Sequence, residues 1–186
     1  MDDHAIVALY WARDERALTE TAAKFGAYCR KIAMNLLASL PDAEEVENDT
    51  WLAAWDSMPE NRPARLAPYL GRITRNLALD RLDQAAAQKR GGGQAALLLD
   101  ELAECLPAPD RVEQEVEAAE LARQISAFLR AQPEPARSMF LRRYWYGDAI
   151  GEIAVRYGMP TGRVRVTLHR TRARLRQALA REGVTV

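Results

Sequence analysis

The carboxy-terminal part of the chain carries a run of arginines that could bind nucleic acid. Residues 161–181 contain seven arginines and no aspartate or glutamate. Arginine forms bidentate hydrogen bonds to phosphate and to the edge of guanine. The alternative is a solvated terminal helix, but such a helix normally mixes both charge signs so that neighbouring turns can pair. The run therefore predicts a contact with DNA.

Helical periodicity divides this run into two faces. At 100° per residue, one stripe that should pack inward holds Thr161, Val164, Leu168, Thr171, Leu175 and Leu179. The outer face would then combine side chains that read base edges with cations that hold phosphates. The predicted DNA-binding residues are Thr161, Arg163, Arg165, Val166, His169, Arg170 and Arg174.

A second basic cluster, interleaved with an aromatic residue, lies in the first half of the chain. It consists of Arg62, Arg65, Arg72 and Arg75, with Asn61, Asn76 and Tyr69 nearby. Cations beside a stacking platform are what a single-stranded or unstacked base requires. Tyr69 also lies on an apolar helical stripe, however, so composition leaves both a nucleic-acid surface and ordinary core packing open.

Helices must position both clusters. Residues 150–157, a turn at Gly158 and residues 161–176 have the pattern of a helix–turn–helix, whose second helix enters the major groove. Asp148 can cap the first of these helices. Upstream, residues 43–58 predict an amphipathic helix with an acidic surface, which Asp42 and Glu45 would begin as a capping box.

Net charge is distributed unevenly along the chain. The 186 residues hold 26 basic and 26 acidic side chains, yet the net charge is −2 over residues 1–90, −7 over 91–120 and +9 over 121–186. Such asymmetry suggests that one part binds nucleic acid. It also lets the acidic segment fold against the basic one in the free chain, which would weaken DNA binding.

Glycine and proline positions divide the chain. Three consecutive glycines begin at Gly91, and Pro107 and Pro109 mark a second break. We predict an all-α protein with two small helical domains, residues 1–90 and 116–186. A flexible acidic linker over residues 91–115 would join them.

Several classes of protein do not fit this sequence. Its apolar runs are too short to span a membrane, and its first residues lack the pattern of a secretory signal. Cys29 and Cys105 suit indifferent thiols in a reducing cytoplasm rather than a metal or disulfide site. With no phosphate-binding loop and no nucleophile beside a base, we expect no enzyme activity, no metal and no cofactor.

Three sets of motifs occur in the order and spacing of a known family. Residues 42–55 resemble a helix that docks on the RNA polymerase clamp, and residues 69–82 resemble a −10 helix. Residues 140–144, 152–154 and 164–175 resemble a −35-binding domain. Together they resemble the extracytoplasmic-function (ECF) group of sigma-70-type sigma factors.

The resemblance implies partners and roles. The partners would be core RNA polymerase, through its β′ clamp and β flap, promoter DNA and an anti-sigma factor. The arginine-coated helix would read the −35 element, and the loop and helix around Tyr69 would hold the −10 element. The −10 residues would be Asn61, Arg62, Arg65, Arg72, Arg75 and Asn76. The core-binding residues would be Glu44, Glu45, Asn48, Asp49, Trp51, Leu52 and Trp55.

Two other functions remain to be weighed. A stand-alone helix–turn–helix regulator would bind a duplex operator as a dimer, but it needs neither the acidic helix nor the Arg72 and Arg75 helix. A helical interaction module without a DNA role leaves the charge pattern of residues 161–176 unexplained.

Overall fold

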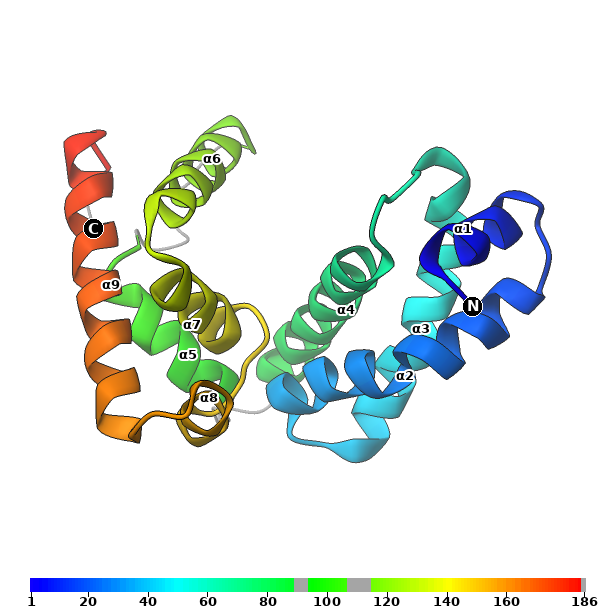
Figure 1. Ribbon diagram of the computed structural model, residues 1–186, viewed down its shortest axis with the longest axis horizontal. Helices are drawn as coiled ribbons and strands as arrows, with labels where there is room; N and C mark the ends of the chain where they lie inside the picture. Colours follow the sequence, from blue (N-terminus) through cyan, green and yellow to red (C-terminus); the bar gives the residue numbers. More distant parts are fainter. Residues whose placement is uncertain (89–93, 107–114, 185–186) are drawn as a thin grey trace. The chain divides into compact units, whose positions relative to one another are not determined.

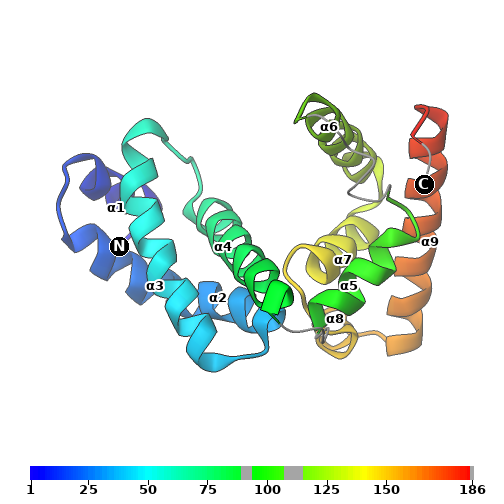
Figure 2. The same cartoon turned by 180° about the vertical axis from the view of Figure 1, so that it is seen from behind.

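The computed structural model describes residues 1–88, 94–106 and 115–184, and every regular element within these ranges is a helix (Figures 1 and 2). The chain divides into two units, Met1–Ala95 and Ala96–Val186. The prediction of an all-α fold is confirmed. None of the described helices is both long and apolar enough to cross a membrane.

The first unit is built on three long helices that pack against one another. They are α2 (Arg16–Leu37), α3 (Leu40–Ser57) and α4 (Leu66–Gln88), and a shorter helix, α1 (Asp3–Trp11), precedes them. A 3-10 turn, η1 (Met58–Glu60), follows α3. The buried side chains at their centre include Tyr10, Phe25, Trp51, Leu66 and Leu70.

Helix α1, which sequence analysis did not assign, fixes the start of α4. One carboxylate oxygen of Asp3 accepts the backbone N–H of Leu66 at 3.0 Å, and the other accepts a hydrogen bond from Lys24 at 2.7 Å. These two bonds, with that from Lys24 the larger influence, lower the pKa of Asp3. A carboxylate at a helix N-terminus also interacts favourably with the helix dipole. Asp3 thereby anchors the helix that carries Arg72 and Arg75 of the cluster expected to bind the −10 element.

The start of α3 differs from the prediction. The helix begins at Leu40, and the Ser39 hydroxyl, rather than Asp42, accepts a backbone N–H at its N-terminus. Asp42 and Glu45 both form ion pairs with Arg81 of α4 instead. The capping-box pattern was therefore misread, because these two carboxylates have a cation within reach from another helix.

The second unit contains a helix on each side of the turn that was predicted at Gly158. Its helices are α5 (Gln94–Ala103), α6 (Glu115–Ala131), α7 (Glu134–Tyr144), α8 (Ile150–Tyr157) and α9 (Thr161–Arg181). The core draws on α7, α8 and α9 through Met139, Phe140, Ile153, Leu168 and Leu175, each at most 5% exposed. Full burial of one such aliphatic side chain stabilises a fold by roughly 1.5–3 kcal/mol.

The turn between α8 and α9 is sharp because Gly158 has a φ of 59°, in the left-handed region that suits glycine. At the other end of α8, the backbone N–H of Ala149 is accepted by Glu152 at 3.0 Å. Asp148 is not the capping residue that the sequence suggested. Its side chain is buried and forms an ion pair with Arg142 at 3.4 Å, so it joins α7 to the segment before α8.

Helix α5 lies inside the segment expected to be a linker, and its polar side chains contact α7 and α9 of the second unit. Residues 89–93 and 107–114 of the expected linker region lie outside the described residues.

Candidate nucleic-acid interface

The outer face of α9 is the strongest candidate for a DNA contact. The residues of the expected inward stripe from Val164 to Leu179 are each at most 2% exposed, whereas Thr161, which was also assigned to that stripe, is exposed. The seven residues predicted to bind DNA are all exposed: Thr161, Arg163, Arg165, Val166, His169, Arg170 and Arg174. Because the apolar stripe is fully used for packing, the arginine-coated face is available to bind a ligand.

The cluster expected to bind the −10 element divides into exposed and half-buried members. Asn61, Arg62, Arg65, Arg72 and Asn76 are exposed, whereas Arg75 is half-buried, and burial lowers the pKa of its guanidinium. The Tyr69 ring is partly buried against the core, and its hydroxyl lies 2.8 Å from the Ser57 hydroxyl. The structure therefore favours a packing role for Tyr69, the second of the two possibilities left open by composition.

Trp11 adds an aromatic side chain to this cluster. The guanidinium of Arg62 lies over the Trp11 ring, 3.5 Å from its centroid. Trp11 is 41% exposed, and the pair borders a surface cavity of about 510 Å³ that His4 and Pro63 also line. A cation stacked on an exposed indole offers a platform suited to an unstacked base. No local pattern predicts that Trp11 lies here, because α1 and the loop before α4 are about 50 residues apart in the chain.

Only some of the α3 residues that were assigned to binding core RNA polymerase are exposed. Glu44, Glu45, Asn48 and Asp49 are exposed, and Leu52 is 63% exposed. Trp51 is buried in the core. Trp55 is half-buried, with the Arg13 guanidinium 5.0 Å from its ring centroid. A partner that docks on α3 would therefore contact the carboxylates and Leu52. Trp51 and Trp55 instead pack α3 against the core of the first unit.

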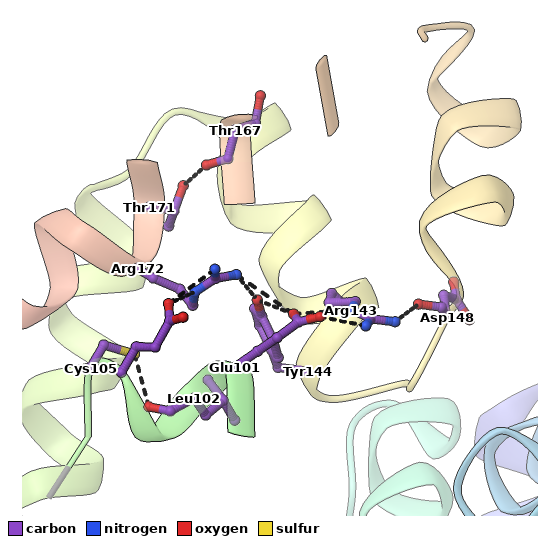
Figure 3. A network of polar contacts seen from close by, with 10 residues as sticks. Glu101, Leu102, Cys105, Arg143, Tyr144, Asp148, Thr167, Thr171 and Arg172 are labelled. Atoms are coloured by element: carbon purple, nitrogen blue, oxygen red, sulfur yellow. Dashed lines mark hydrogen bonds and ion pairs between the residues drawn. The ribbon is translucent and has the colours of Figure 1, made fainter. Parts of the chain in front are cut away.

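A polar network joins α5 to the helix–turn–helix (Figure 3). One carboxylate oxygen of Glu101 lies 2.7 Å from a guanidinium nitrogen of Arg143 in α7, and the other accepts a hydrogen bond from the Tyr144 hydroxyl at 2.8 Å. Arg172 of α9 donates to the same hydroxyl, and it forms ion pairs with Glu101 at 3.6 Å and with Glu104 at 3.2 Å. Three helices therefore meet at one carboxylate.

The electrostatics of Glu101 reflect this arrangement. Burial by itself would raise the pKa of its carboxyl group. The hydrogen bonds from Arg143 and Tyr144, with the charges of Arg143 and Arg172, outweigh burial and lower that pKa. The same site raises the pKa of the Tyr144 hydroxyl, mainly through burial. Glu101 is consequently ionised at neutral pH, as an ion-pair partner must be.

Within the described residues, no three His, Cys, Asp or Glu side chains are grouped so that they could hold a metal ion. Cys29 and Cys105 are both buried and free, and burial raises the pKa of each thiol to about 11. Both are therefore protonated at neutral pH, as expected for thiols without a redox role.

Comparison with known proteins gives relatives of one kind. A probable RNA polymerase sigma factor, RfaY of Xanthomonas campestris pv. campestris, is 30% identical over 149 residues, which cover 80% of this chain and 36% of that protein. ECF RNA polymerase sigma factor SigE of Mycolicibacterium smegmatis is 29% identical over 154 residues, which cover 82% of this chain and 58% of SigE. The chain thus spans less than two thirds of either relative.

One solved structure, that of CnrH in complex with the cytosolic domain of CnrY, aligns with a TM-score of 0.43 and 21% identity. The alignment covers 96% of this chain and 97% of that one. Two family models also match the sequence: Sigma-70 region 2 over residues 22–88 and ECF sigma factor over residues 64–181. Because the second model alone covers more than half of the chain, this protein belongs to the ECF sigma factor family.

Proposed function

We propose that the chain is a promoter-specificity subunit, which binds core RNA polymerase and directs it to −10 and −35 elements. The observation that carries this proposal is the outer face of α9, where all seven predicted DNA-binding residues are exposed on a helix without acids. In a helix–turn–helix this face enters the major groove. Family membership supports the same conclusion.

The first unit would act on the −10 element. Arg65 and Arg72 are exposed cations that can hold phosphates, and Arg62 stacked on Trp11 offers a platform for a base that has left the duplex. An aromatic or cationic platform stabilises an unstacked base by about 1–3 kcal/mol. This arrangement suits the opening of the duplex, which a simple duplex binder does not need.

Partner binding would use other surfaces. The exposed carboxylates of α3, with Leu52 among them, would dock on the β′ clamp of the polymerase. The second unit would contact the β flap, and an anti-sigma factor would hold the chain silent until it is needed. All of these encounters would take place in the cytoplasm, where the polymerase works.

Transcription in vitro tests the proposal. Purified core polymerase is mixed with the chain and a library of genomic DNA fragments, and the 5′ ends of the transcripts are sequenced. Initiation at defined sites that share two conserved elements is the expected result. The matched control is a chain with Glu44→Lys and Asp49→Lys, which keeps α9 intact and should lose initiation with core. Absence of defined initiation, together with tight binding of a duplex by the chain alone, would instead favour a stand-alone regulator.

A further inference from the structure

The acidic helix α5 and the basic helix α9 are in contact within the second unit. Arg172 of α9 lies beside Glu101 (Figure 3) and also forms an ion pair with Glu104, and its side chain is only 13% exposed. On the helical wheel, Arg172 lies between the buried stripe and the exposed Arg165 and Arg176. Helix α5 therefore covers the edge of the basic face that α9 presents.

This contact changes the charge that DNA would meet. Glu101 and Glu104 bring two carboxylates to the side of α9. Non-specific affinity for DNA depends on the number of phosphates that cations neutralise, and each such contact releases a counterion. An arginine already held by carboxylates cannot make that contact without first losing its partner. Docked α5 should therefore reduce the electrostatic affinity of α9 for a duplex.

The contact of α5 with the rest of the second unit has a buried part and an exposed part. Its most buried cation is Arg143, whose side chain is 4% exposed, and Leu98 and Cys105 contribute the buried apolar contacts near α5. The Glu104 carboxylate, by contrast, is 61% exposed. An ion pair with such an exposed partner contributes little to stability and is screened by salt. The part of the contact that covers Arg172 is thus its weakest part.

We propose that α5 is an intramolecular mask of the DNA-reading helix, which lowers the DNA affinity of the free chain by occupying Arg172 and the adjoining edge of α9. The inference rests on the proposed role of α9 in reading DNA. Displacement of α5 would then expose the full basic face. The mask is best tested at Glu104, because this exposed carboxylate contributes least to the stability of the fold.

The experiment compares the full-length variant Glu104→Gln with Asp100→Asn. Both remove one negative charge from α5, but Asp100 is exposed and forms none of the ion pairs that the structure shows with α9. Binding to a fluorescent 30-base-pair duplex of mixed sequence is measured between 50 and 200 mM salt. One added phosphate contact steepens the slope of log K against log[salt] by about 0.9. Arg172 keeps its ion pair with Glu101 in Glu104→Gln, so one full phosphate contact is the upper bound. The advantage of Glu104→Gln over wild type should then grow by up to about 3.5-fold from 200 to 50 mM salt, with little change for Asp100→Asn.

A second substitution shows whether the gain depends on Arg172. In the Glu104→Gln background, Arg172→Ala should abolish the added affinity, because the released cation is then missing. Equal affinities for wild type, Glu104→Gln and Asp100→Asn would overturn the mask while leaving DNA reading by α9 intact. A weaker Glu104→Gln would also overturn it, by showing that α5 supports DNA binding. If no form binds the duplex even at 50 mM salt, DNA reading by α9 fails and the mask fails with it.

The buried thiols report directly on α5. Cys105 is 1% exposed and follows α5 immediately, while Cys29 lies in the core of the first unit. Labelling by a maleimide, followed residue by residue by mass spectrometry, should be slow at both thiols in the wild type. In Glu101→Gln, the labelling rate at Cys105 should rise at least severalfold, with Cys29 as the unchanged internal reference. A rate at Cys105 that does not respond to Glu101→Gln would contradict docking through this carboxylate.

Discussion

A Cβ atom at Gly71 would lie 2.5 Å from the hydroxyl oxygen of Tyr28 and 3.3 Å from Ile32, so α4 packs closely against α2 at a residue that has no side chain. Gly71→Ala should destabilise the first unit by about 1–3 kcal/mol, because overpacking forces rigid neighbours to shift. The measurement is urea unfolding monitored by tryptophan fluorescence. Most of this signal comes from the first unit, because Trp11, Trp51 and Trp55 lie there.

Gly151 provides the matched control for that substitution. It lies in α8, and a Cβ at this position would have no neighbour within 4 Å. Gly151→Ala should therefore stabilise the second unit by about 0.5–1 kcal/mol through the higher helix propensity of alanine. A Gly71→Ala chain as stable as wild type would show that Tyr28 moves aside freely.

Replacement of Arg165 or Arg170 by alanine should weaken recognition of the −35 element. Both side chains are exposed on the outer face of α9, and a base-directed arginine is worth about 1–3 kcal/mol of discrimination. Promoter binding by holoenzyme is measured on matched and scrambled −35 sequences, with the exposed Arg130→Ala of α6 as the control for loss of charge. An equal loss on both sequences would identify the arginine as a phosphate contact.

Charge reversal at Glu44 and Asp49 should reduce affinity for core polymerase and leave the fold unchanged, because both carboxylates are exposed on α3. Glu45 is less suitable, since its reversal would also break the ion pair with Arg81. Binding is measured by competition for core polymerase, and circular dichroism checks the helices. Normal assembly of both reversed variants would place the core-binding surface elsewhere.

Acid should weaken the second unit through Glu101. Its pKa in the folded chain lies below the ordinary value of 4.5, so the unfolded chain binds more protons in the interval between the two. The stabilisation is complete above about pH 4.5 and is lost as the pH falls through the lowered pKa. Calorimetry from pH 7 to pH 3 should show a smaller acid-induced loss of stability in Glu101→Gln than in the wild type.

At neutral pH the same Glu101→Gln chain should be less stable than wild type. The nearly buried guanidinium of Arg143 would lose its charged partner, and a hydrogen bond to a charged group contributes about 1.5–3 kcal/mol. If the stability of the two chains depended on pH in the same way, protonation of Glu101 would not be a cause of the acid-induced loss of stability.

Helical periodicity predicted the orientation of α9 well, because the apolar face and the arginine-rich face of this helix differ so clearly. A stripe from Val164 to Leu179 can pack in one way, which leaves the arginines outside. Charge patterns were a weaker guide wherever a partner came from a distant segment. Asp42 and Asp148 looked like helix caps. Asp42 instead pairs with Arg81 of α4, and Asp148 pairs with Arg142 of the preceding helix, α7. Local sequence does not reveal such competition.

Two features of the candidate sites depend on contacts across long stretches of sequence. Trp11 meets Arg62, and Glu101 meets Arg172, although in each case the partners are dozens of residues apart. Helix α5 did carry a local signal, since Gln94–Ala103 consists largely of alanine, leucine and acidic residues that favour helices. The neighbouring glycines and prolines outweighed that signal and led to the prediction of a linker.

Helix α5 belongs to the same chain as the helices it contacts, and this connection determines how effectively DNA can compete with α5 for Arg172. A segment tethered by a short stretch of chain has an effective concentration on the order of millimolar at its own binding site. A duplex at micromolar concentration meets that competitor at every encounter, however weak the individual ion pairs are. When polymerase already holds the sigma factor beside promoter DNA, the DNA phosphates would be present at a comparable local concentration and could compete with α5 for Arg172. Access to Arg172 would then depend on assembly rather than on the amount of DNA in the cell.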